Sequence, residues 1–192
     1  MIDAAHVTDY FALLDQPRRP WLDDATLRDA YHRRAAALHP DAPTGDGPAF
    51  AVLNTAFATL RDPVPRLRHL LALEEPEALT RPTPIPADLG ELFPVVGAAR
   101  QMMVGFTARR AAASSAVARA LLAGEEATVR STAAAARSAL DASRARALGE
   151  LRALDAHWPA PEARAALAAL HGRFSFLEKW DAQLREAGVG LG

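Results

Sequence analysis

The chain has 192 residues, of which 50% are hydrophobic, with a formal net charge of -1 and no cysteine. This charge balance lacks the basic excess of a dedicated nucleic-acid binder, and without cysteine the chain has no disulfides, thiol nucleophiles or cysteine-ligated zinc. Because the start lacks a signal-peptide pattern and no apolar run is long enough for a membrane span, we expect a cytoplasmic protein. The length fits one medium domain or two small ones.

The first predicted elements are two helices. Residues 9–14 form a short apolar segment, and Asp23 and Asp24 supply a cap and negative charge for a longer helix. In this longer helix the apolar residues recur at steps of four, four and three, which predicts one buried face and an outward basic face. The apolar positions are Leu27, Tyr31, Ala35 and Leu38, and the outward positions are Arg28, His32 and Arg33.

A third helix follows a turn at residues 45–48 and ends at Pro63. Between the second and third helices lies the tripeptide His39-Pro40-Asp41, which we therefore expect in an exposed loop between two antiparallel helices. The apolar positions of the third helix are Phe50, Leu53, Phe57 and Leu60.

This region resembles the J-domains of DnaJ-type co-chaperones. The resemblance rests on three motifs in the same order and spacing, at residues 9–14, 30–41 and 56–63. In J-domains the tripeptide loop and the basic second helix dock on a DnaK-type ATPase and stimulate its hydrolysis of ATP. The resemblance therefore implies that this contact is made by His39, Pro40 and Asp41, with support from Arg28 and Arg33.

The rest of the chain predicts a second helical domain. A short helical pattern at 66–73 is followed by four prolines within residues 76–86, which favour a stiff, extended linker. Beyond it the sequence is rich in Ala, Leu and Arg and has no strand-like alternation. We therefore predict an all-α protein with a J-domain at 1–75, a linker at 76–86 and a three-helix bundle at 87–192.

Three helices are predicted in the bundle. The first covers 88–123, with a kink at Pro94, and stops at Gly124; the second covers 125–158; the third covers 161–188. The third has an apolar seam typical of an antiparallel bundle. Its seam consists of Leu167, Leu170, Phe174, Leu177 and Leu184.

Phe176 lies about a hundred degrees around the third helix from Leu177 and so falls outside the seam. Trp180, one turn further on, lies at the edge of the seam on the same side. Phe176 either covers a neighbouring element or belongs to an exposed apolar patch, a feature that marks interaction sites.

The whole chain resembles the HscB family, J-proteins dedicated to iron–sulfur cluster assembly, in its motifs at 9–11, 65–73 and 173–179. In that family the C-terminal bundle binds the cluster scaffold protein IscU. The resemblance implies a client site formed by Leu89, Leu92, Phe93 and Phe176, although Phe93 and Val96 stand where the family carries glutamates.

We therefore expect a co-chaperone without enzymatic activity, cofactor or metal, whose partners are an HscA- or DnaK-type ATPase and an IscU-like scaffold; the alternative is an unrelated client. A hydrolase using His39 and Asp41 lacks a nucleophile motif, and His32 and His39 lack further ligands for a metal. Nucleic-acid binding by the bundle arginines is disfavoured because acidic residues offset them and no aromatic platform accompanies them. Those arginines are Arg109, Arg110, Arg119, Arg130, Arg137, Arg144 and Arg146.

Overall fold

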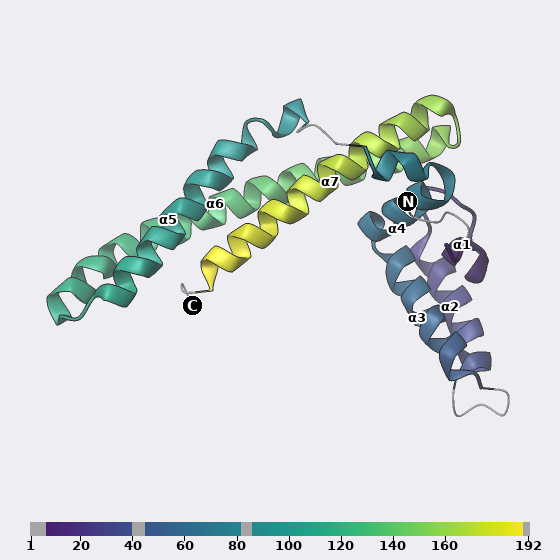
Figure 1. The fold of residues 1–192 in the computed structure, drawn as a ribbon, viewed down its shortest axis with the longest axis horizontal. Helices are drawn as coiled ribbons and strands as arrows, with labels where there is room; N and C mark the ends of the chain where they lie inside the picture. Colours follow the sequence, from purple (N-terminus) through teal and green to yellow (C-terminus); the bar gives the residue numbers. More distant parts are fainter. Residues whose placement is uncertain (1–6, 40–44, 82–85, 190–192) are drawn as a thin grey trace. The chain divides into compact units, whose positions relative to one another are not determined.

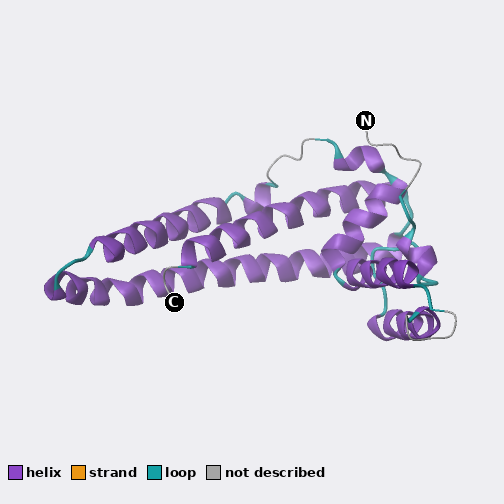
Figure 2. Ribbon diagram, turned by 60° about the horizontal axis from the view of Figure 1, so that its bottom comes forward, coloured by secondary structure: helices purple, strands orange, loops and turns teal. Residues whose placement is uncertain are grey.

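The computed structural model describes residues 7–39, 45–81 and 86–189, and this part of the chain is helical without a β-strand (Figures 1 and 2). The all-α prediction is confirmed. The α-helices are α1 (Tyr10–Leu13), α2 (Asp24–Leu38), α3 (Gly47–Arg61), α4 (Pro63–Glu74), α5 (Leu92–Ala112), α6 (Ala116–Leu154) and α7 (Pro161–Gly188). Short 3-10 turns are η2 (Pro76–Leu79), η3 (Ala87–Leu89) and η4 (Asp155–His157).

Each of the first four helices begins at an aspartate cap, because a carboxylate accepts the backbone N–H groups that a helix start leaves unpaired. Asp9 accepts from Phe11 at 3.0 Å, and Asp23 accepts from Thr26 at 2.8 Å. Asp46 and Asp62 cap α3 and α4 in the same way. These caps explain why the helix starts are well specified by the sequence.

The chain divides into two compact units, of which the first comprises Met1–Thr83 and Leu148–His171. The later segment is tied to the earlier one by Asp155, which accepts hydrogen bonds from Arg19 Nε at 2.9 Å and from the Trp21 amide at 3.1 Å. Trp158 Nε1 also donates to the Arg18 carbonyl at 2.7 Å. The last residues of α6 and the first residues of α7 are therefore part of the first unit, whereas the sequence-based division assigned them to the bundle.

The second unit comprises Pro84–Ala147 and Gly172–Gly192. In it α5 lies beside parts of α6 and α7 (Figure 1). Ala133 and Ala136 are buried on α6, and their small side chains allow the helices to approach closely. The buried core of this unit consists of Leu89, Val96, Ala99, Met103, Phe106, Val129, Ala133, Ala136, Leu140, Leu177, Trp180 and Leu184.

The predicted boundary between the first two bundle helices is wrong. The break lies after Ala112 and not at Gly124, which sits within α6. Ser115 provides the signal that the sequence analysis missed: its Oγ accepts from the Ala118 amide at 3.1 Å and caps α6. Gly124 does not adopt the positive φ that lets glycine end a helix. Pro94 lies in the first turn of α5, where a missing N–H breaks no helical hydrogen bond.

The third bundle helix matches its prediction at both ends. All the predicted seam residues of α7 are buried, and Trp180 is buried with them. Spacing alone identified this face, because the helix packs against neighbours along most of its length.

Candidate functional site

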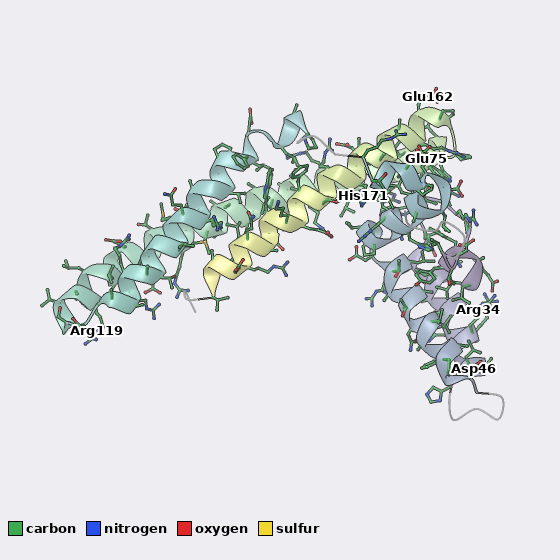
Figure 3. All side chains as sticks on the ribbon, viewed as in Figure 1. Arg34, Asp46, Glu75, Arg119, Glu162 and His171 are labelled. Atoms are coloured by element: carbon green, nitrogen blue, oxygen red, sulfur yellow. The ribbon has the colours of Figure 1, made fainter. Side chains whose placement is uncertain are left out.

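The tip of the α2–α3 hairpin begins at His39, the residue directly after α2. Its amide donates to the Ala35 carbonyl at 2.9 Å, and its exposed imidazole meets the Phe50 ring edge-on with centroids 5.3 Å apart. Pro40 and Asp41 lie outside the described residues. On the other side of the loop, the Asp46 amide donates to the Leu38 carbonyl at 3.2 Å. This hydrogen bond joins the two ends of the loop, close to Asp46 in Figure 3.

The hairpin is rigid below this loop because α2 and α3 are joined by a polar and an aromatic contact. Tyr31 donates its hydroxyl to Asn54 Oδ1 at 2.8 Å. The same ring stacks on Phe57 with centroids 4.3 Å apart. Leu27 of α2 and Leu53 of α3 are both buried. The loop is thus held by a well-packed pair of helices.

The arginines of α2 differ in their surroundings, and two of them face solvent. Arg28 and Arg33 are exposed; the first pairs with Asp24 at 3.7 Å, and the second donates to the Asp29 carbonyl of its own helix at 3.4 Å. Exposed ion pairs of this kind contribute little to stability, so these guanidinium groups can exchange partners readily.

Arg34 points elsewhere and binds the carboxylate of Asp15 at 2.6 Å, which fastens α2 to the segment after α1. Arg34 lies within the helix predicted from sequence, but this structural role is visible only in the fold. Asp15 has a positive φ of 53°, a backbone conformation that few residues other than glycine adopt.

A shallow hollow on the outward face of α2 is lined by Thr26, Asp29, His32 and Arg33. The predicted contact residue Arg33 therefore has His32 and Asp29 as neighbours on the surface. Sequence reasoning recognised His32 as outward-facing but did not include it, or Asp29, in the site. Asp29 precedes His32 by three residues and Arg33 by four, and this helical spacing is the signal that groups them.

The motif at 65–73 has a structural role, which is clearest at His69. The imidazole is buried under α1, where its Nε2 accepts the Tyr10 amide at 3.1 Å and its ring stacks on Tyr10 with centroids 4.4 Å apart. Burial lowers the pKa of His69, because the charged form loses its hydration. The neutral tautomer with a free Nε2 lone pair is the form that this hydrogen bond needs.

We expect the stability of the protein to fall as the pH drops below about 6.5, because of His69. In the unfolded chain this imidazole takes up a proton near pH 6.5, whereas its pKa is lower in the folded state. Between these two values the unfolded state binds more protons, so the free energy of unfolding decreases with decreasing pH. His171, whose pKa burial also lowers, acts in the same direction.

Urea denaturation between about pH 7.5 and about pH 5.5 measures this dependence. The substitution His69→Phe keeps an aromatic ring but cannot titrate, so its stability should change less over the same range. An equally steep pH dependence in the variant would show that other groups cause it.

The second unit carries a cluster of three aromatic side chains from α5 and α7. Phe93 and Phe176 both contact Trp180, with ring centroids 6.1 Å and 6.0 Å from the Trp180 ring. The Phe93 side chain is 58% exposed, Trp180 is buried, and Phe176 is partly buried against the core. We call Phe93, Phe176 and Trp180, together with the partly buried Leu92, the aromatic patch.

The structure brings three of the four predicted client residues into this patch but places Leu89 elsewhere. Leu89, at the end of η3, is fully buried in the core of the second unit, so it supports the patch without being accessible. Val96 is buried as well, which explains why this position is apolar. Trp180 lies at the centre of the patch; its place at the edge of the α7 seam was the sequence signal for this role.

Among the described residues no cluster of His, Asp or Glu is arranged to hold a metal ion. In the same part of the chain, every helix is too short or too polar to cross a lipid bilayer.

Comparison with known proteins gives two partial matches. The chain is 38% identical over 80 residues to "Co-chaperone protein HscB homolog" of Aromatoleum aromaticum (strain DSM 19018 / LMG 30748 / EbN1), covering 34% of this chain and 41% of that protein. It is 39% identical over 72 residues to the protein of the same name from Burkholderia vietnamiensis (strain G4 / LMG 22486), covering 33% and 41%. The chain thus matches 41% of the length of these curated relatives. No family model and no solved structure matches.

Proposed function

We propose that this chain is a J-protein co-chaperone that stimulates ATP hydrolysis by an HscA- or DnaK-type chaperone. Its partial matches to two HscB homologues support this proposal. The chain delivers an IscU-like iron–sulfur cluster scaffold protein to that chaperone, works in the cytoplasm and has no catalytic activity of its own. The observation that carries the proposal is the exposed His39 at the tip of two capped helices that pack against each other.

The chaperone-docking surface comprises the loop residues His39, Pro40 and Asp41 together with Arg28 and Arg33. A docking residue at the tip of a well-packed hairpin, as His39 is, can contact a partner without reordering the helices, which lowers the entropic cost of binding. The two exposed arginines on α2 attract an acidic partner surface and speed association. The neighbouring His32 extends this surface.

The client-binding surface is the aromatic patch. A large exposed ring that rests on a buried tryptophan is typical of binding hot spots, since it loses little conformational freedom on binding. Phe93 is this ring, and Phe176 and Leu92 form its apolar surroundings.

A J-protein with the same ATPase partner and an unrelated client is the second candidate. The observation that favours it is Phe93, an exposed apolar side chain at a position where the HscB family, by the resemblance above, carries a glutamate. Direct titration of the chain with an IscU-like scaffold distinguishes the two candidates.

The chaperone half of the proposal is tested by single-turnover ATP hydrolysis. A DnaK-type chaperone preloaded with ATP should hydrolyse it faster when the chain is added, and the chain alone should hydrolyse none. Unchanged hydrolysis with the HscA- and DnaK-type chaperones of the same organism would contradict the proposal.

Replacing Phe176 by Ala should weaken scaffold binding by about 2 kcal/mol, as expected for an aromatic side chain that becomes buried in an interface. The loss of folding stability should be small, because Phe176 is only partly buried. Isothermal titration with the scaffold and urea denaturation measure the two effects on the same variant.

Phe174→Ala is the matched control, since Phe174 is fully buried on the same helix two residues earlier. It should cost about 3 kcal/mol or more of stability but leave the affinity of the folded fraction unchanged. If Phe176→Ala shows this same pattern, Phe176 is a core residue and the client surface lies elsewhere.

A further inference from the structure

Two exposed cations flank the aromatic patch. Arg100 lies seven residues, or two turns, after Phe93 on the same side of α5, and Lys179 lies one turn after Phe176 on α7. Neither side chain forms an ion pair among the described residues. Between Phe93 and Arg100 lies Gly97, around which a Cβ atom would meet nothing within 4 Å. A partner can therefore approach the backbone of α5 between the aromatic ring and the positive charge.

The acidic side chains nearest to Lys179 are paired with other groups or too distant. Glu178 lies 4.0 Å from Arg144, and Asp181 pairs with Arg185 at 3.0 Å. Glu186 lies on the outward side of α7 but seven residues from Lys179, about 10 Å along the helix axis, which exceeds ion-pair distance.

On α5 the acid closest to the patch is Glu91. It precedes Phe93 by two residues, which places it on roughly the opposite side of the helix. Among the side chains that the structure describes, the aromatic patch is therefore bordered by two uncompensated positive charges, Arg100 and Lys179.

We propose that the client surface bound at the aromatic patch is apolar with carboxylates at its edge, and that Arg100 and Lys179 select it by charge. This inference rests on the proposed function, because it specifies the chemistry of the same client site. Charges at the rim of an interface accelerate association and reject partners of like charge, while the apolar centre supplies the affinity.

Two other occupants fit the patch less well. A second copy of the chain, placed symmetrically, would bring the same cations face to face, and like charges would repel. A nucleic acid would supply negative charge, but Trp180 is buried and Phe176 is partly buried, so only Phe93 offers a largely exposed ring. Single-stranded nucleic acids require several exposed rings on which successive bases stack.

Charge reversal with a matched control tests the inference. The variant Arg100→Glu/Lys179→Glu, the single variant Arg100→Glu and the parent are titrated with an IscU-like scaffold protein at low and moderate salt. The control is Arg119→Glu, since Arg119 is exposed and carries no ion pair in the described structure. It lies near the start of α6 (Figure 3), and α5 extends roughly 30 Å from Phe93 to the turn before it.

The double reversal should weaken binding on the order of tenfold, mainly by slowing association, and the parent's affinity should decrease with salt. Arg119→Glu should stay within about twofold of the parent. If the double reversal binds like the control, the charge inference is wrong, although the client site can stand. If the scaffold does not bind the parent at all, both the inference and the client half of the proposed function fail, whereas stimulation of the chaperone is measured separately.

Discussion

Replacing His39 by Gln is expected to abolish the stimulation of ATP hydrolysis while the protein stays folded. His39 is exposed at the start of the loop, and its backbone hydrogen bond to Ala35 does not depend on the side chain. The substitution removes the edge-on contact with Phe50, and because His39 is exposed the free energy of unfolding should change by no more than about 0.5 kcal/mol. Single-turnover hydrolysis and thermal denaturation measure the two effects.

The control for this substitution is His157→Gln, which makes the same chemical change at another exposed histidine. It should stimulate hydrolysis as well as the parent does. Equal loss of stimulation in both variants would mean that the loss is not specific to His39. Full stimulation by His39→Gln would show that the loop is not the docking site.

Replacing Arg66 by Ala is expected to cause a large loss of stability, about 3 kcal/mol or more. Arg66 is buried, and its guanidinium donates to the Pro20 carbonyl at 3.0 Å and to the Leu60 carbonyl at 2.9 Å. Burial lowers the pKa of this group, an effect that nearby carboxylates oppose. Truncation would leave two carbonyl groups unpaired and create a cavity, and both effects destabilise the folded state.

Arg68→Ala provides the comparison for Arg66→Ala, because Arg68 is exposed on the same helix, α4. Its free energy of unfolding should remain within about 0.5 kcal/mol of the parent value. Urea denaturation at constant pH measures both variants. Equal stability of the two variants would mean that the buried hydrogen bonds of Arg66 contribute nothing to the fold.

The hairpin was predictable from sequence because its signals are local. An aspartate before each helix, Asp23 and Asp46 for example, fixes the start, and apolar residues at helical spacing fix the buried face. The boundary between α5 and α6 was not predictable in the same way. In the sequence, Gly124 is a stronger signal for the end of a helix than Ser115 is for the start of one. The choice between the two positions depends on packing in the second unit.

The role of Arg66 also lay beyond sequence reasoning, since one of its acceptors, Pro20, is 46 residues away. The same holds for Asp155, which binds Arg19 from 136 residues away and so joins the segment after α6 to the N-terminal part of the first unit. In sequence these charged residues resemble an ordinary solvated helix surface. Only the fold shows that distant segments bring their partners to them.

Helical periodicity predicted the exposure of those site residues that lie on α-helices. It did not predict the exposure of the residue that lies in a 3-10 turn. Helical spacing placed Phe176 outside the α7 seam, and the structure brings it beside Trp180. Leu89 could not be placed this way, because it belongs to the 3-10 turn η3 and its side chain enters the core. Phe93, two residues into α5, remains exposed.

The most direct test of a chain that joins a chaperone to its client is ATP hydrolysis measured with both partners present. The rate of a DnaK-type chaperone should rise when the chain is added and rise further when an IscU-like scaffold is added with it. The further rise should disappear in the variant Phe93→Ala/Phe176→Ala, while the stimulation by the chain alone persists. A scaffold effect that is the same with this variant as with the parent chain would contradict delivery of the client through the aromatic patch.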